Sequence, residues 1–340
     1  MEMRALGRSG VRVSSLCLGA MAFGARGNTD HDDSVRIIHR ALDAGINFVD
    51  TADVYSQGES EEIVGRALKG RRDDVVLATK FFNPMGEDPN RRGMSRRWIV
   101  KACEESLRRL DTDHIDLYQV HRLDEETDLD ELLGALSDLV RQGKVRMVGS
   151  STFPAEAIVE AHWTSERRGH VPLRTEQPPY SILVRGIERD VLPTCARYGM
   201  GVLVWSPLNS GWLTGKYRSG QTPEAASRLG KLGRNVDGPT GRRKTEAVEQ
   251  LEAIAADAGL DLITLALAFT LAHPAVTSSI IGPRTMEQLE SQVPAASVTL
   301  TAETLDRIDE VVRPGETITR RDVAFEPRSI RFPAERRRTG

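Results

Sequence analysis

The segment VVLATKFFNPMGEDPNRRGMSRRWIVKACEESLRRLDTDHIDLYQV, residues 75–120, contains two short apolar runs with a long helical pattern between them. The runs Val75–Lys80 and Ile115–Val120 have the length and composition of buried strands. Between them, the apolar side of a helix over Ser95–Leu110 consists of Trp98, Ile99, Ala102, Ser106 and Leu107. Two parallel strands need a crossover of this kind, so the segment predicts one β–α–β unit of a parallel sheet.

The same alternation continues outward in both directions from this unit. Toward the N-terminus the pattern predicts the strands and helices Leu16–Leu18, Asp32–Ala44, Asn47–Asp50 and Ser60–Lys69. Toward the C-terminus it predicts Asp128–Gln142, Val145–Gly149, a helix opened by Pro154, Leu173–Gln177, Ile187–Tyr198, Gly201–Trp205, Lys244–Ala258, Leu262–His273, Ser278–Ile281 and Thr285–Gln292. Eight strands in such alternation, with no linker between them, favour a closed (β/α)8 TIM barrel of the α/β class over an open doubly wound sheet.

Three further segments complete the predicted architecture. Arg4–Leu6 and Val11–Val13, with a turn at Ser9–Gly10, predict an N-terminal β-hairpin ahead of the barrel. The Gly- and Arg-rich segment at about 206–243 exceeds ordinary connection lengths, as loops that cover a ligand often do. An irregular tail is expected at about 315–340. We therefore expect one domain over residues 1–340.

Composition excludes several classes of partner. The net charge is only −3 and 28% of the residues are charged, so no strong field exists to attract nucleic acid or an anionic membrane. Cys17, Cys103 and Cys195 are far apart and odd in number, which is typical of a reduced protein without a disulfide framework. The longest apolar stretch, Leu260–Ala272, is too short to span a bilayer. These features predict a soluble, cytoplasmic protein and leave its oligomeric state open.

Polar or reactive side chains stand where the predicted strands end. They are Asp50, Lys80, His121, Ser150, Ser151, Gln177, Trp205, Ser206, Gly282 and Arg284. Each has an ordinary explanation when taken singly, such as a turn cap, a solvated lysine or a hydrogen-bonded core histidine. In a (β/α)8 barrel, however, the carboxyl ends of all strands form one rim, which is where active sites lie. Their convergence predicts a catalytic site there.

At this point the sequence resembles the aldo-keto reductase superfamily, from Met3 to about Val311. Within the superfamily it is most similar to the microbial and potassium-channel-β-subunit-like branches. The motifs that carry the resemblance agree in order, spacing and placement at strand ends. They are LGRSGVRVSSLCLGAMAFG, DTADVYSQGESEEIVGRAL, LATK, IDLYQVHR, GKVRMVGSS, EQPPYS, VWSPLNSG and IIGPRTMEQL.

The resemblance implies NADPH-dependent reduction of an aldehyde or ketone to an alcohol, with a tetrad of Asp50, Tyr55, Lys80 and His121. Hydride transfer leaves negative charge on the carbonyl oxygen, so a proton donor must meet it. Tyr55 would be that general acid, and a cationic Lys80 would make its proton easier to give up. Asp50 would hold Lys80 by ion pairing, and a neutral His121 would orient the carbonyl.

The resemblance also assigns the cofactor site. Asp50, Ser151, Thr152 and Gln177 would lie at the nicotinamide, with Trp205 stacked on its ring; Ser206 and Leu208 would cover the pyrophosphate; and the adenosine end would meet Gly282, Arg284, Gln288 and Gln292. Arg284 suits the 2′-phosphate of NADPH because it is a fixed charge near a helix start. Four residues differ from the usual family pattern: Thr152, Pro178, Trp205 and Gln292.

Two rival functions remain to be weighed. A metal-dependent hydrolase on the same barrel would need a ligand cluster such as H-x-H on the first strand, which here reads LCLG, so no metal is expected. An NADPH-binding sensor or regulatory module with little turnover stays open. So does the substrate, whether an aromatic aldehyde, a ketose or a sugar-nucleotide ketone. The expected pocket walls are Phe23, Tyr55, Phe81–Arg92, Arg122–Asp124 and Trp212.

Overall fold

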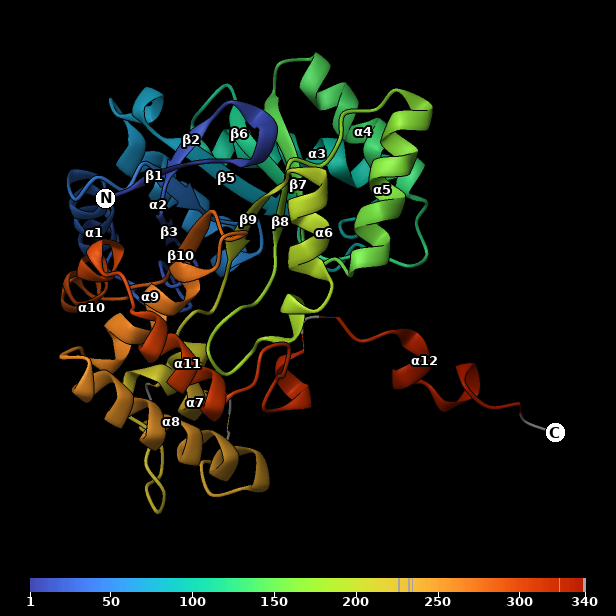
Figure 1. Ribbon diagram of the computed structural model, residues 1–340. Helices are drawn as coiled ribbons and strands as arrows, with labels where there is room; N and C mark the ends of the chain where they lie inside the picture. The colour runs from blue at the N-terminus through green and yellow to red at the C-terminus, as the bar shows by residue number, and fades with distance from the viewer. Residues whose placement is uncertain (226, 232, 234, 324, 339–340) are drawn as a thin grey trace.

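The computed structural model describes residues 1–225, 227–231, 233, 235–323 and 325–338. Eight parallel strands form a closed barrel, and helices surround it (Figure 1). In order around the barrel the strands are β10 (Ser278–Ile281), β3 (Leu16–Gly19), β4 (Phe48–Asp50), β5 (Val76–Phe81), β6 (Ile115–Val120), β7 (Val145–Ser151), β8 (Thr175–Gln177) and β9 (Gly201–Val204). This confirms the predicted (β/α)8 barrel.

Helices cover the outer face of the barrel, as Figure 1 shows. The α-helices of the described residues are α1 (His31–Asp43), α2 (Glu59–Leu68), α3 (Arg96–Leu110), α4 (Leu129–Arg141), α5 (Ala155–Arg168), α6 (Val191–Tyr198), α7 (Arg228–Lys231), α8 (Pro239–Asp257), α9 (Leu262–Ala272), α10 (Met286–Gln292), α11 (Ala302–Val311) and α12 (Arg328–Arg331). Of these, α12 lies on the tail that projects from the barrel. Polar side chains cap several of them: Ser95 accepts a hydrogen bond from the Trp98 amide at the start of α3, and Asp261 does the same for Thr264 at α9.

The predicted N-terminal hairpin closes the amino end of the barrel. Its strands are β1 (Met3–Ala5) and β2 (Arg12–Ser14), each displaced by one residue from the prediction because a 3-10 turn at Gly7–Ser9 takes up the connection. Leu6 and Val13 pack onto an apolar cluster with Cys17, Phe48, Ala78, Leu117, Leu203 and Ile280. Polar access is thereby restricted to the opposite rim, at the carboxyl ends of the strands.

The structure corrects several predicted boundaries in the second half of the chain. Helix α8 begins at Pro239 rather than Lys244, because its first turn has a favoured proline but no apolar periodicity. The predicted helix Ile187–Tyr198 divides into a 3-10 turn, Gly186–Glu188, and α6, because Asp190 caps the Val191 amide. Helix α11 was not predicted at all. The predicted strand Leu173–Gln177 is shorter, beginning at Thr175.

The two predicted irregular segments contain short helical turns. The 206–243 segment includes a 3-10 turn η5 (Asn209–Thr214), α7 and the start of α8. The tail includes a 3-10 turn η7 (Arg320–Asp322), α12 and a last turn, Pro333–Glu335, and it extends away from the barrel (Figure 1). Residues 226, 232, 234, 324, 339 and 340 of these two segments lie outside the described residues.

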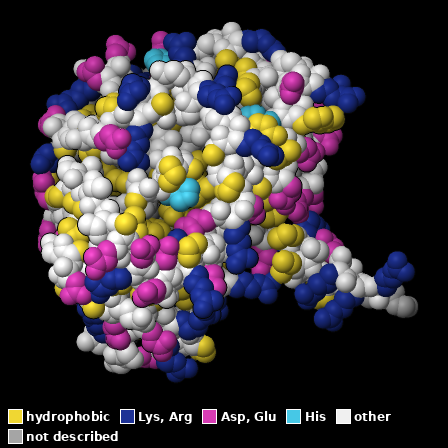
Figure 2. Space-filling model, viewed as in Figure 1, with side chains coloured by type: hydrophobic (Ala, Val, Ile, Leu, Met, Phe, Trp, Pro, Cys, Tyr) yellow, Lys and Arg dark blue, Asp and Glu magenta, His cyan; other side chains and the backbone are white. Residues whose placement is uncertain are grey.

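Charged side chains of both signs are interspersed over the face shown in Figure 2, and Lys and Arg gather on the projecting tail. Among the helices that the structure describes, none alone is long and apolar enough to cross a membrane. Helices α8 and α9 pass that test only as a pair, and the pair is bent by 90°.

Two helical glycines provide a matched test of how tightly the helices pack. A Cβ atom on Gly65 in α2 would lie 2.5 Å from the backbone oxygen of Leu110, whereas one on Gly134 in α4 would meet side chains alone, the guanidinium of Arg96 at 3.2 Å and the ring of His170 at 3.5 Å. Overpacking against rigid backbone typically costs about 1–3 kcal/mol, so Gly65→Ala should lower the free energy of unfolding by that amount.

Gly134→Ala is the control, and it should be neutral or stabilising by up to about 1 kcal/mol because alanine favours the helix. Urea denaturation of both variants measures the difference. Equal stability of the two would contradict the close packing of α2 against the end of α3.

Candidate active site

Three neighbouring strands bring the predicted tetrad together. Asp50 is the last residue of β4, Lys80 lies near the end of β5, and His121 directly follows β6. In the barrel register Asp50 pairs with Ala78, so Lys80 stands two residues further toward the rim, above Asp50. Tyr55 opens a 3-10 turn, η2 (Tyr55–Gly58), after β4. The structure therefore brings all four side chains together at the carboxyl rim.

Lys80 is a fully buried cation whose donors are all engaged. Its Nζ donates to Oδ2 of Asp50 at 2.6 Å, to the carbonyl of Thr51 at 2.8 Å and to the Tyr55 hydroxyl at 3.3 Å. Burial alone would lower the pKa of Lys80, but attraction to Asp50 and Tyr55 raises it above its ordinary value. The ammonium therefore stays charged beside the tyrosine oxygen.

The second carboxylate oxygen of Asp50 orients two glutamines. Its Oδ1 accepts from Nε2 of Gln177 at 2.9 Å and from Nε2 of Gln119 at 3.3 Å. This fixes the amide of Gln177 with its nitrogen toward Asp50, and its Oε1 makes no hydrogen bond to any residue that the structure describes. Sequence reasoning missed Gln119, which lies inside β6 and looks like a polar interruption of an apolar run.

His121 is neutral and has a defined tautomer. Burial, with the positive charges of Lys80 and Arg122, holds its pKa well below the ordinary value. Its Nδ1 lies 3.1 Å from Nδ2 of Asn83, an amide nitrogen that can only donate, so Nδ1 accepts and the ring proton is on Nε2. The rings of His121 and Tyr55 meet edge to face, with centroids 5.8 Å apart. A donor N–H is thus available near the tyrosine hydroxyl.

The ends of β7 and β8 form a shelf beside the tetrad. Ser151 donates to the carbonyl of Gln177 at 2.8 Å, and Thr152 adopts a left-handed backbone with φ 63°. Beneath them Glu176, fully buried, accepts from the Ser150 hydroxyl at 2.5 Å and from the Phe153 amide at 3.1 Å. Sequence reasoning missed Glu176, although a carboxylate inside a strand is a signal in itself.

The segment after β9 forms a strained turn at the rim. The backbone amide of Trp205 donates a hydrogen bond to the carbonyl of Pro178. In the residues that follow, Ser206, Asn209 and Ser210 have φ values of 59°, 46° and 57°, in the left-handed region. The carbonyl of Leu208, which is partly buried against the core, accepts backbone hydrogen bonds that close the turn. The indole Nε1 of Trp205 is buried and has no partner among the described residues.

Lys244 of α8 anchors this turn, and sequence reasoning did not identify it. The buried Nζ donates to Oδ1 of Asn209 at 2.6 Å and forms an ion pair with Asp322 of the tail at 2.5 Å. It also lies 5.5 Å from the centre of the Trp212 ring. One side chain therefore connects α8, η5 and the tail.

The predicted adenosine-binding residues lie at the end of β10 and along α10. Gly282 is exposed, with open space where a side chain would begin. Gln288 turns back so that its Oε1 accepts from the Arg284 amide at 2.8 Å, so this amide is already occupied. Gln292 is buried, and its Oε1 has no partner in the described part of the chain.

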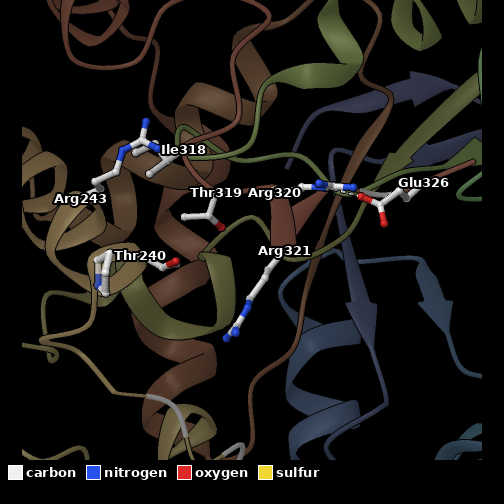
Figure 3. A pocket seen from close by; sticks show the side chains of 8 residues that line it. Thr240, Arg243, Ile318, Thr319, Arg320, Arg321 and Glu326 are labelled. Carbon is white, nitrogen blue, oxygen red and sulfur yellow. Dashed lines mark hydrogen bonds and ion pairs between the residues drawn. The ribbon is translucent and has the colours of Figure 1, made fainter. Parts of the chain in front are cut away.

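A separate cavity of about 510 Å³ lies between the start of α8 and the tail (Figure 3). It is lined by Pro239, Thr240, Arg243, Ile318, Thr319, Arg320, Arg321 and Glu326. In Figure 3 Arg320 turns toward Glu326, with which it forms a hydrogen bond of 2.5 Å, and Arg321 extends in another direction. None of the predicted site residues lines this cavity.

Within the described residues no group of three or more His, Cys, Asp or Glu side chains could hold a metal ion.

Comparison with known proteins shows what the whole chain is similar to. A family model described as "Aldo/keto reductase family" matches residues 15–313. An uncharacterized oxidoreductase of Bacillus subtilis, YrpG, is 41% identical over 323 residues, covering 92% of this chain and 96% of that protein. A probable voltage-gated potassium channel subunit beta of Oryza sativa is 37% identical (92% and 97% covered), and the versiconal hemiacetal acetate reductase of Aspergillus parasiticus is 32% identical (93% and 100% covered).

The buried Glu176 predicts a distinct pH dependence of stability. Burial raises the pKa of Glu176 from its ordinary value of 4.5 to about 7. Because the folded-state pKa is the higher one, its contribution to stability is complete below pH 4.5 and is lost as the pH rises through about 7. The loss amounts to at most about 3 kcal/mol.

Glu176→Gln keeps an acceptor for the Phe153 amide and removes the titrating group, so its free energy of unfolding should vary less with pH in that window. Urea denaturation at a series of pH values measures this. Glu166→Gln, at an exposed position of α5, is the control and should follow the wild type. Parallel pH profiles for Glu176→Gln and the wild type would show that Glu176 does not titrate there.

Proposed function

The chain belongs to the aldo/keto reductase family, and from this premise we propose that it reduces an aldehyde or ketone to an alcohol with NADPH as hydride donor and Tyr55 as proton donor. The carbonyl-reducing oxidoreductase class follows from the family match and from relatives named as reductases. The single observation that supports the finer proposal is the buried Lys80 ammonium, held between the Asp50 carboxylate and the Tyr55 hydroxyl.

The residues at the rim fit a nicotinamide nucleotide. Ser151, Thr152 and the accepting Oε1 of Gln177 would hold the carboxamide, with Trp205 against the ring. The turn over Ser206 and Leu208 would lie along the pyrophosphate, and Gly282, Arg284, Gln288 and Gln292 along the adenosine. Two observations favour such a ligand: Ser206, Asn209 and Ser210 hold a left-handed backbone in one turn at the rim, and the buried Oε1 of Gln292 has no partner among the described residues. When bound, the nicotinamide supplies the hydride.

The protein's own residues handle the proton and the charge. His121 would donate a hydrogen bond from Nε2 to the carbonyl oxygen of the substrate. This would fix which face of the carbonyl group is presented to the nicotinamide. Tyr55 would give its proton to that oxygen as negative charge develops there. Lys80 would stabilise the tyrosine oxygen left behind, since its Nζ already lies 3.3 Å away. Asp50 keeps Lys80 at that place, because an ammonium in this buried position needs a carboxylate partner.

A regulatory module that binds NADPH with little turnover is the second candidate. Its support is the 37% identity to a probable potassium channel subunit beta. Turnover separates the two candidates: NADPH oxidation with any member of a panel of aldehydes, ketones and keto-sugars favours the enzyme. We also propose that residues 1–340 act as one domain.

The role of Tyr55 is testable with one substitution. Tyr55→Phe removes the proton donor and keeps the ring, so NADPH affinity, measured by fluorescence titration, should persist. General acid catalysis typically contributes about 10²–10⁴-fold, so kcat should fall by that factor on a good substrate. Tyr198→Phe is the control, since this tyrosine stacks on His162 elsewhere in the molecule, and it should keep wild-type kcat. A Tyr55→Phe enzyme with near-wild-type kcat would refute the proton-donor role.

The proposed contact of Arg284 with the 2′-phosphate predicts that NADPH is preferred over NADH. Arg284→Ala should weaken NADPH binding by roughly 1.5–3 kcal/mol, the usual worth of a charge-assisted hydrogen bond, and barely change NADH binding. Arg40→Ala is the control, because Arg40 is partly exposed and pairs with Glu290 at the same helix α10. Equal wild-type affinity for the two nucleotides, measured by fluorescence titration, would remove the basis of this assignment.

A further inference from the structure

Arg122 is a cation at the active-site rim, and no acidic residue in the described part of the chain pairs with it. It follows His121 directly after β6, and its Nη1 donates to the His121 carbonyl at 2.8 Å and to Oγ1 of Thr152 at 2.6 Å. Its guanidinium lies 5.8 Å from the centre of the Trp205 ring. Within the described residues no carboxylate oxygen lies within salt-bridge distance of Arg122. The guanidinium is therefore held among three residues of the site but is not neutralised there.

The surroundings of Arg122 make this lack of a counter-ion costly. Arg122 is only partly exposed, and burial lowers the pKa of its guanidinium. The buried carboxyl group of Glu176 attracts the guanidinium, but its oxygens accept hydrogen bonds from the Ser150 hydroxyl and the Phe153 amide. Burial also raises the pKa of Glu176 to about 7. A partly desolvated cation needs an anion to offset the lost hydration, and the described protein does not provide one.

The unused part of the guanidinium has a specific shape. Nη1 is occupied, while Nε and Nη2 donate no hydrogen bond to any described residue. That Nε–Nη2 edge presents two parallel N–H groups, the arrangement that binds a carboxylate in a bidentate manner. Lys80 is already neutralised by Asp50, whereas the guanidinium of Arg122 keeps its positive charge at the rim and can pair with one monoanionic group.

We propose that Arg122 binds a carboxylate on the substrate, so that the preferred substrates are carbonyl compounds carrying a carboxylate a short distance from the reducible carbonyl. This rests on the proposed function, because the tetrad defines where the carbonyl lies. Tyr55 and His121 would bind the carbonyl oxygen, and Arg122, next in sequence to His121, would select the charged end. Arg122 is in this sense a specificity-determining residue.

Matched substrate pairs test the proposal. The three isomers of carboxybenzaldehyde and their methyl esters differ in charge and little in shape. For at least one isomer, wild-type kcat/KM should be about 10–100-fold higher for the acid than for the ester, mainly through KM, since a charge-assisted hydrogen bond is worth that factor. In Arg122→Gln this acid-to-ester ratio should fall to about one. Arg122→Lys should retain part of it, because lysine keeps the charge but loses the bidentate edge.

A binding measurement provides a readout other than turnover. Benzoate, but not benzamide, should bind the wild-type protein in calorimetry, with an affinity that falls as salt is added, and Arg122→Gln should lose this binding. Arg97→Gln, at an exposed position of α3, is the control and should keep both the ratio and the binding. Thermal unfolding of each variant establishes that it is folded.

The outcomes distinguish this inference from the function it rests on. Reduction of acids and esters with equal kcat/KM would leave the reductase in place and overturn the role of Arg122. An Arg122→Gln variant that loses acid and ester activity equally, together with NADPH affinity, would overturn it as well. If no aldehyde is reduced but benzoate still binds in an Arg122-dependent manner, the proposed reductase fails and carboxylate recognition by Arg122 is supported.

Discussion

The ion pair of Lys80 and Asp50 is the constraint on which the rest of the site depends. An ammonium with no exposed surface is stable only if its attraction to fixed partners exceeds the hydration it loses, and removing one partner of such a pair typically costs about 3–5 kcal/mol. The barrel meets this requirement through strand order alone, since β4 and β5 are neighbours in register. Two consequences follow. Asp50, committed to Lys80, orients Gln119 and Gln177 with its other oxygen, and the fixed positive charge contributes to keeping His121 neutral.

The four tetrad residues and the residues that differ between members of the family lie in different parts of the rim. The family match accounts for a general carbonyl reduction, and relatives with quite different names match this chain over almost its whole length. What distinguishes one substrate from another must come from the residues that face the open side, and here Arg122, Thr152 and Trp205 form a contiguous group. Thr152 has a left-handed backbone, which for a β-branched residue is strained, and the hydrogen bond from Arg122 is among the contacts that hold it.

Sequence alone predicted the barrel because its strands are buried on both faces and therefore read as apolar runs separated by amphipathic helices. It placed Asp50, Lys80 and His121 at one rim for a related reason, because each interrupts or ends an apolar run. The tetrad itself, with Tyr55, came from the resemblance to the aldo-keto reductase superfamily. The sequence did not predict the roles of Glu176 and Gln119, because these depend on contacts with residues from other parts of the chain. Glu176 accepts a hydrogen bond from the Phe153 amide, and Gln119 donates one to Asp50. The start of α8 was predicted too late, because a first helical turn that faces solvent shows no periodic spacing of apolar residues. No local pattern relates Lys244 to Asp322, which meet only after the chain has completed the barrel.

That last contact has a consequence for where this protein can end. Asp322 supplies the negative charge for a lysine that is buried in α8 and holds the turn at Asn209. A chain terminated by a premature stop codon a few residues earlier would retain every strand of the barrel and every member of the tetrad, yet would remove the carboxylate of Asp322 from the buried Lys244 ammonium. The turn beside Trp205 would lose its anchor. Residues beyond Asp322 are not needed for this contact, although Arg328 pairs with Glu125 and Glu126 in the loop after β6. The stretch up to Asp322 is therefore the part of the tail that supports the turn beside Trp205.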